Sequence, residues 1–191
     1  MKTIYTFDRM EKMRSENPSK IIEELGFEET IRLACAMLIN ERWKEELQEF
    51  AVSLLQDLRK KYANKWNSSW RFDALLGFAN DIIMDYDERY EAFKRAIEKA
   101  NPAPPELLIA YAKCNSSPGI PPVTEEEAIA LIKKAMKDKL YVEGVMFLRG
   151  IYWSMKNKKE ELFWSNVLDK IKDNGAKLPR LDKIPNITDD C

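Results

Sequence analysis

The sequence contains no histidine among its 191 residues. Histidine is the commonest general base near neutral pH and the usual partner of the nucleophile in Ser-His-Asp and Cys-His sites, so its absence excludes these mechanisms and histidine-based zinc sites. Glycine is scarce and dispersed, and neither G-x-x-x-x-G-K-[ST] nor G-x-G-x-x-G occurs. The sequence therefore predicts a protein that is not an enzyme and that binds no cofactor or metal.

Cysteine is also rare. The three cysteines, Cys35, Cys114 and Cys191, are an odd number without C-x-x-C spacing, which is typical of a reducing compartment and not of a disulfide framework or a zinc ribbon. No run of about 18 apolar residues occurs, and residues 1–20 lack the apolar core of a signal peptide. We therefore expect a cytoplasmic protein that does not associate with a membrane.

No charge of one sign dominates, because 31 Lys and Arg residues face 32 Asp and Glu residues. A balanced chain produces no net field that attracts a polyanion, so nucleic acid is not expected as a partner. Apolar residues make up 45% of the chain and charged residues 33%, as in helix-rich globular proteins. We expect one folded unit. The sequence does not determine the oligomeric state, and we favour a monomer.

Apolar residues recur at intervals of three and four along most of the chain, which predicts helices almost throughout. Asn17 followed by Pro18 is a helix start, and Gly26 ends the short helix that begins there. The strongest local signal is the segment TEEE, in which Thr124 and Glu127 have the spacing of a capping box. These signals predict where individual helices begin and end.

The predicted fold class is all-α, an irregular α/α array of about seven to eight helices that pack as hairpins in the manner of an α-solenoid. Residues 1–175 are expected to form a single helical domain, in which 1–16 are a flexible lead and 87–175 are repeat-like hairpins. Residues 176–191 are expected to form an irregular tail. The segment from Tyr141 to Met155 is apolar on most sides, which predicts a central helix that neighbours bury on more than one face.

The predicted hairpins over 87–175 resemble tetratricopeptide repeats. In the second helix of each of two successive predicted hairpins, large and small residues alternate at helical spacing. These residues are Phe93 and Ala96 in the first hairpin, and Ala128, Ile132 and Ala135 in the next. The two helices are 39 positions apart, counted from Ala96 to Ala135, whereas that repeat has a period of about 34 residues. The resemblance covers the second half of the chain, and it implies a scaffold, similar also to armadillo arrays, whose surface binds other proteins.

Two groups of carboxylates are the main candidates for a partner-binding site. Glu41, Glu45 and Glu49 recur every four residues on one predicted helix, where like charges repel by a few tenths of a kcal/mol. The second group consists of Asp81, Asp85 and Glu88. A cationic partner would relieve the repulsion, although a solvated helix face has the same pattern and Asp85 also suits a turn or a helix cap.

The tryptophans are the second kind of candidate. Trp66 and Trp70 flank a predicted break between helices, and because interface energy concentrates in Trp, Tyr and Arg, either is a candidate hot spot if its side chain is exposed. Trp43, Trp153 and Trp164 lie on or beside apolar stripes and are expected to pack in the core.

A basic cluster stands at the predicted end of a helix and consists of Arg59, Lys60, Lys61 and Lys65. These cations are placed to contact phosphate or lipid. Cations at a helix C-terminus also complement the helix dipole without any partner, and we favour that interpretation.

Together these observations favour a non-catalytic protein-binding module. The first hypothesis is a bacterial immunity or antitoxin protein that neutralises a cognate toxin, such as a basic nuclease, by occluding it. The alternative is a tetratricopeptide-like adaptor or chaperone that binds a peptide in a groove. A third hypothesis is a carboxylate-dependent hydrolase, which requires a close pair of buried carboxylates in a pocket.

Overall fold

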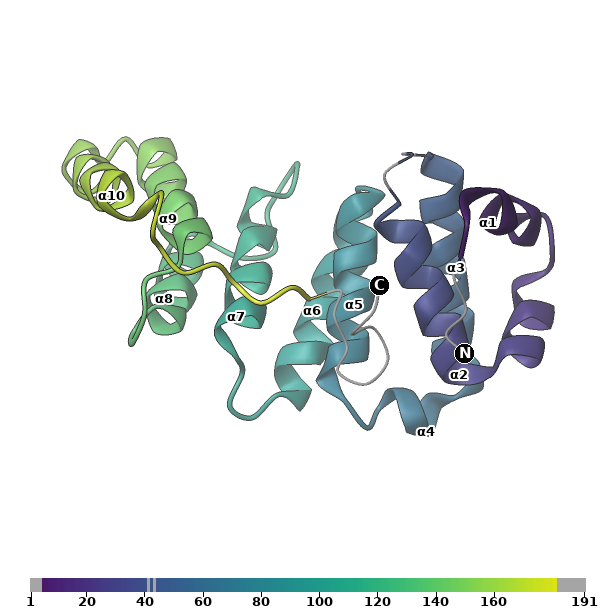
Figure 1. Ribbon diagram of the computed structural model, residues 1–191. Helices are drawn as coiled ribbons and strands as arrows, with labels where there is room; N and C mark the ends of the chain where they lie inside the picture. Colours follow the sequence, from purple (N-terminus) through teal and green to yellow (C-terminus); the bar gives the residue numbers. More distant parts are fainter. Residues whose placement is uncertain (1–4, 41, 43, 182–191) are drawn as a thin grey trace. The chain divides into compact units, whose positions relative to one another are not determined.

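The computed structural model describes residues 5–40, 42 and 44–181 (Figure 1). This part of the chain is all-helical and contains no strands, with helices packed as hairpin-like pairs, which confirms the predicted all-α array. The elements are α1 (Phe7–Arg14), α2 (Pro18–Leu38), α3 (Glu45–Lys61), α4 (Ala63–Trp66), α5 (Trp70–Ile82), α6 (Tyr86–Lys99), α7 (Pro105–Ala112), the 3-10 helix η1 (Lys113–Ser116), α8 (Glu125–Ala135), α9 (Val142–Ser154) and α10 (Lys158–Ile171). The described residues thus form more helices than the seven to eight expected, because α1 and the four-residue α4 were not predicted.

The described residues divide into two compact units. The first, here called the N-terminal unit, contains the described residues up to Lys99 together with Leu181, and the second, the C-terminal unit, contains Ala100–Arg180. The single domain expected over 1–175 stays a prediction. Glu41, Trp43 and most of the expected irregular tail lie outside the described residues. No helix of the described part is long and apolar enough to cross a membrane.

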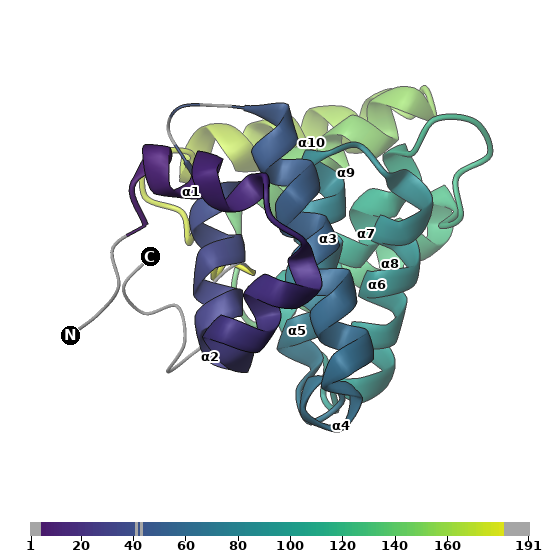
Figure 2. The ribbon, with the colours of Figure 1, turned by 90° about the vertical axis from the view of Figure 1, so that its right-hand side faces the viewer.

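The N-terminal unit is built from two helical hairpins. Helix α2 packs against α3, α5 packs against α6, and α3 contacts α5, so that one continuous apolar core extends across both pairs. Helix α1 packs against α2 and α3 (Figure 2) and inserts the fully buried Met10 into this core. The expected flexible lead over residues 1–16 therefore contains a packed helix, because Phe7 and Met13 also pack against the core beside Met10.

The predicted helix signals act as expected in the N-terminal unit. The side chain of Asn17 accepts a hydrogen bond from the backbone N–H of Ser19 at 2.9 Å, and Pro18 occupies the first turn of α2. Gly26 has φ 72° and interrupts α2, which is the conformation that an L side chain disfavours. The chain continues in helical conformation after this break, so the two predicted helices on either side of Gly26 form one kinked element.

The C-terminal unit also consists of two hairpin pairs, α7 with α8 and α9 with α10. Thr124 caps the N-terminus of α8: its hydroxyl accepts a hydrogen bond from the backbone N–H of Glu127 at 3.2 Å, which is one of the two bonds of the predicted capping box. The segment after α10 returns to the start of α9, where the N–H of Val142 donates to the carbonyl of Ala176 at 3.1 Å. The unit is therefore closed by contact between the two ends of the α9–α10 pair.

Helix α9 differs from the prediction. Its buried residues lie on one side, whereas Met146 and Trp153 on the other side are 51% and 65% exposed. The prediction that neighbours bury this helix on several faces, and that Trp153 packs in the core, is wrong. The main neighbours of α9 in the described part of its unit are α10 and α8, and α10 itself has no buried residue.

Candidate protein-binding surfaces

The carboxylates predicted on α3 are exposed. The side-chain carboxylates of Glu45 and Glu49 form no hydrogen bond or ion pair with a described residue, and Glu45 lies in the first turn, where a negative charge also complements the helix dipole. Glu41, the remaining member of the predicted row, lies outside the described residues. The two described members are therefore available to a cationic partner.

The second predicted group is not one continuous row, because the chain turns between α5 and α6. Asp81 forms an ion pair with the buried guanidinium of Arg89. Asp85 accepts a hydrogen bond at 3.2 Å from the backbone N–H of Glu88 and so satisfies a donor in the first turn of α6. Asp81 and Asp85 thus stabilise the turn, and the alternative interpretation of Asp85 as a helix-start residue is confirmed.

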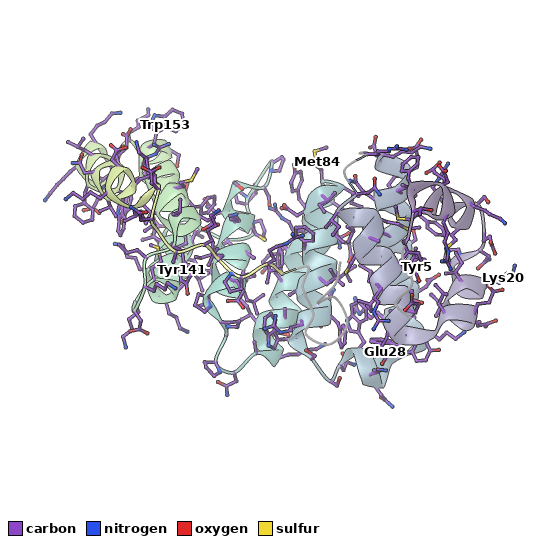
Figure 3. All side chains as sticks on the ribbon, viewed as in Figure 1. Tyr5, Lys20, Glu28, Met84, Tyr141 and Trp153 are labelled. Carbon is purple, nitrogen blue, oxygen red and sulfur yellow. The ribbon has the colours of Figure 1, made fainter. Side chains whose placement is uncertain are left out.

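The turn between α5 and α6 presents an exposed methionine among these acids. Met84 is 65% exposed and has φ 59°, a left-handed conformation that is uncommon for a side chain of this size. It lies at the same end of the N-terminal unit as the start of α3 (Figures 1 and 3). We name this surface the acidic end and define it by Glu45, Glu46, Glu49, Asp81, Met84, Asp85 and Asp87. It combines a protruding apolar side chain with carboxylates, a composition suited to a protein partner with basic residues.

Trp66 does not belong to a surface. Its side chain is fully buried, and its Nε1–H donates to Oδ1 of Asp73 at 3.1 Å. Asp73 is also completely buried and forms ion pairs with Arg95, at 3.3 Å, and with Lys99. Trp66 was a hot-spot candidate only if its side chain was exposed, and this condition is not met. Its indole N–H instead donates a hydrogen bond to a buried carboxylate that joins α4, α5 and α6.

Trp70 is partly exposed at the first residue of α5. The guanidinium of Arg71 lies over its ring, 4.5 Å from the centroid, in the geometry of a cation–π contact. Trp70 therefore remains a candidate contact residue, with one face of its ring already covered by the neighbouring side chain.

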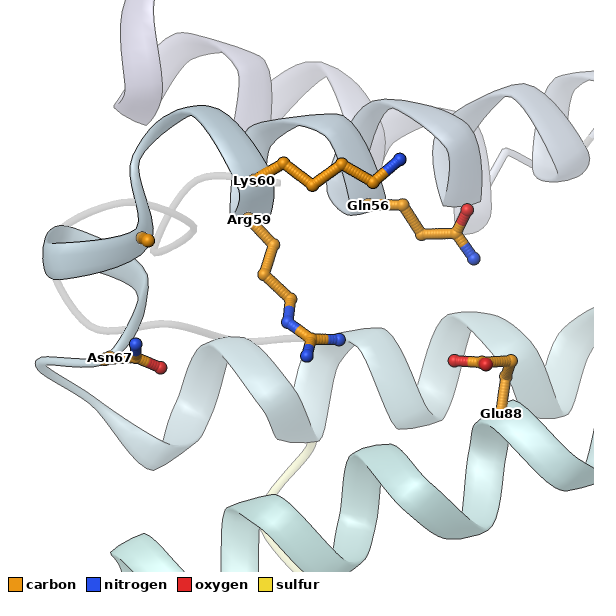
Figure 4. Close-up of a pocket in the computed structure, with 6 residues that line it drawn as sticks. Gln56, Arg59, Lys60, Asn67 and Glu88 are labelled. Atoms are coloured by element: carbon orange, nitrogen blue, oxygen red, sulfur yellow. The ribbon is translucent and has the colours of Figure 1, made fainter.

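A groove of about 550 Å³ runs beside α3 in the N-terminal unit (Figure 4). Its lining consists of Gln56, Arg59, Lys60, Ala63, Asn67 and Glu88. Arg59 extends into the space between α3 and the α5–α6 hairpin, and Glu88 points into the same space from α6 (Figure 4). Glu88 is thus a predicted site residue that lines this groove. Nothing in the sequence shows that Arg59 lies opposite it, because they meet only through the packing of two hairpins.

The other members of the basic cluster are paired within the N-terminal unit. Lys60 lies 3.1 Å from Asp57, Lys61 lies 2.9 Å from Glu23, and Lys65 forms an ion pair with Glu28. The hydrogen bond from Lys65 lowers the pKa of Glu28 below its ordinary value. Three of the four cations are therefore neutralised locally, which favours the interpretation that these lysines serve the fold.

The C-terminal unit presents an apolar surface that was not predicted. Helix α9 exposes Met146 and Trp153, whose spacing of seven residues places them on one face, and α10 exposes Leu162 and Phe163 by 63% and 54%. We name these four residues the apolar face. One signal in the sequence points to it: the run Leu162-Phe163-Trp164 is apolar at consecutive positions, which on a helix covers more than one side.

Catalytic groups would form a different kind of site. The described residues contain no cluster of three or more His, Cys, Asp or Glu side chains that could hold a metal ion. Two carboxylates are buried in the described part of the chain, Asp73 in the N-terminal unit and Glu106 in the C-terminal unit. Neither unit therefore shows, among its described residues, the pair of buried carboxylates that the hydrolase hypothesis requires.

No protein-family model, no curated protein and no solved structure matches this chain. The similarity to tetratricopeptide repeats thus rests on the spacing of residues in the sequence and on the helical hairpins, and it assigns no family.

Proposed function

We propose that this chain is a non-catalytic protein-binding module, and more specifically an immunity or antitoxin protein that neutralises a cognate toxin by covering it. The observation that carries the proposal is the acidic end of the N-terminal unit. There, the carboxylates of Glu45 and Glu49 have no partner among the described residues, and Met84 protrudes in a left-handed conformation. Backbone strain and exposed apolar side chains are both features that a fold retains at contact sites.

The partner that this surface fits is a basic protein such as a nuclease. Unpaired carboxylates steer a cationic partner and fix its orientation, and an exposed apolar side chain such as Met84 adds contact area from which water is excluded. A nuclease must present cations to its own nucleic-acid substrate. Covering those cations with carboxylates would block the substrate without any catalytic residue in the inhibitor.

The experiment begins with the immobilised chain, extract of the native cell, and identification of the captured protein. We expect a basic toxin whose capture weakens as salt rises from about 0.05 M to 0.5 M, because surface charges are screened over a Debye length of about 10 Å at 0.1 M. The double variant Glu45→Lys, Glu49→Lys should lose capture and should no longer inhibit the toxin.

A matched control keeps the net charge change the same. Glu125→Lys with Glu126→Lys reverses two exposed charges in the first turn of α8, in the C-terminal unit. This variant should capture the partner as the unaltered chain does. Equal loss in both double variants would show a general charge effect, and no loss in either would refute docking through the acidic end.

A second candidate function, an adaptor that binds a peptide or helix of another protein, is favoured by the apolar face of the C-terminal unit. Trp153→Ser should abolish capture if this candidate is correct, whereas Ile120→Ser should have no effect. Ile120 is 97% exposed in the loop before α8, so it controls for loss of an exposed apolar side chain elsewhere in the same unit.

A further inference from the structure

The groove beside α3 contains a guanidinium without a partner. Arg59 makes no hydrogen bond or ion pair with any described residue, although the neighbouring cations Lys60 and Lys61 are each paired with a carboxylate. The dipole of α3 explains why cations stand in its last turn. It does not explain why this one side chain extends into the groove (Figure 4) instead of toward an acid on the surface.

The groove offers hydrogen-bond donors beside Arg59. Oδ1 of Asn67 already accepts a hydrogen bond from Nζ of Lys99 at 2.7 Å, so the group that Asn67 still offers is its amide N–H₂. The amide of Gln56 lines the same groove one helical turn from Arg59. A planar guanidinium flanked by amides is suited to bind the two oxygens of a carboxylate.

The wall opposite these donors is acidic. Glu88 points into the groove from α6 (Figure 4) and has no ion pair with a described residue. A ligand that places a carboxylate against Arg59 and a cation against Glu88 would satisfy both walls. We propose that the groove binds a short segment of a partner protein in which an acidic side chain, held by Arg59, stands close to a basic side chain, held by Glu88.

A phosphate ligand fits this groove less well. Phosphate-binding sites gather several unpaired cations or helix N-termini around a doubly charged group. Here Lys60 shares its charge with Asp57, and Glu88 would repel a phosphate that Arg59 attracts. One unpaired guanidinium facing one carboxylate matches a segment without net charge.

The inference rests on the proposed function, because its ligand is part of a protein partner, and it names the chemistry of one contact with that partner. It remains compatible with a basic toxin, since a single acidic side chain on the toxin is enough to occupy Arg59. The acidic end and the groove are tested separately, because the experiment below uses short peptides and no toxin.

The probes are two peptides with blocked ends, Gly-Glu-Gly-Lys-Gly and Gly-Gln-Gly-Lys-Gly, titrated into the ¹⁵N-labelled full chain and followed by NMR. The Glu peptide should shift the Nε–Hε resonance of Arg59 and the side-chain amide resonances of Gln56 and Asn67. The Gln peptide should bind at least about tenfold more weakly and so shift them less at equal concentration, because a hydrogen bond to a charged group is roughly twice as strong as one between neutral groups.

Variants of the chain separate the groove from general charge. Arg59→Gln should weaken binding of the Glu peptide at least about tenfold, whereas Lys60→Gln, which removes the adjacent charge, should change it less than about twofold. Glu88→Gln should abolish the preference for the Glu-Lys peptide over Gly-Glu-Gly-Gln-Gly.

Three results would overturn the inference. The first is an absence of shifts with the Glu peptide at millimolar concentrations. The second is equal weakening by Arg59→Gln and Lys60→Gln, which would mean that only the net charge acts. The third is stronger binding of inorganic phosphate than of the Glu peptide, which would assign the groove to phosphate groups. If the peptide binds and no toxin is captured, the groove stands and the proposed function fails.

Discussion

Asp73 joins three helices of the N-terminal unit through one buried carboxylate. Its carboxylate is completely buried and receives hydrogen bonds from the indole of Trp66 at 3.1 Å and from Arg95 at 3.3 Å, together with an ion pair from Lys99. These partners come from α4 and α6, so the carboxylate joins three helices. Asp73→Asn keeps the size and one acceptor oxygen but removes the charge.

The magnitude follows from the burial of the partners. Removing one member of a buried ion pair costs about 3–5 kcal/mol when the other is left in a dry interior. The side chains of Arg95 and Lys99 are 24% and 25% exposed, so water recovers part of that loss. We therefore expect Asp73→Asn to lower the free energy of unfolding by about 2–3 kcal/mol. Asp73→Ala should cost about 1–3 kcal/mol more, since the indole N–H of Trp66 then loses its acceptor.

The assay is native-state hydrogen exchange of the backbone amides of α5 and α6, measured by mass spectrometry at increasing urea, because it reports on the unit that contains Asp73. The control is Asp57→Asn, which removes a carboxylate paired with Lys60, a side chain that is 77% exposed. That change should cost less than about 1 kcal/mol. If Asp73→Asn also costs less than about 1 kcal/mol, the buried ion network does not hold the three helices together and the reasoning is refuted.

The remaining predictions concern two glycines and one ion pair. A methyl group at Gly77 would lie 2.6 Å from the ring of Phe93, so Gly77→Ala should destabilise the N-terminal unit by about 1–3 kcal/mol in urea unfolding. A methyl group at Gly150 in α9 would meet no other atom, so Gly150→Ala should stabilise the C-terminal unit by about 0.5–1 kcal/mol through helix propensity. If both variants changed the free energy of unfolding in the same direction, the packing at these two glycines would be contradicted. The pKa of Glu28 is lowered in the folded chain by the hydrogen bond from Lys65, so this carboxyl stabilises the fold above its ordinary pKa of 4.5 and the contribution is lost as pH falls through the lowered value. The stability difference between the unaltered chain and Glu28→Gln should thus be under about 1 kcal/mol at neutral pH, because both side chains are nearly half exposed. It should shrink as pH falls below 4.5 and vanish below the lowered pKa, whereas a difference that grows toward acid would contradict the sign.

Helix starts and the fold class were predictable because they depend on neighbouring residues. Asn17 and Thr124 cap helices through backbone groups two or three positions away, and Gly26 interrupts α2 through its own φ. The first helix was missed because its apolar stripe is short and charges are scattered through it. The candidate site was predictable only in part: Glu45, Glu49, Asp81, Asp85 and Glu88 are described and lie in one unit, but the sequence did not show which of them are paired.

The sequence by itself determined an all-helical protein without histidine chemistry, with the beginnings of several helices and a set of carboxylates available for binding. These properties follow from composition and from contacts within one or two turns of helix. The tertiary structure alone decided that Trp66 is buried against Asp73 and that Trp153 is exposed, because an apolar stripe shows which face seeks a neighbour but not whether a neighbour covers it. It also brought Arg59 and Glu88 to the two walls of one groove, since residues 29 positions apart in the sequence meet only when the hairpins pack.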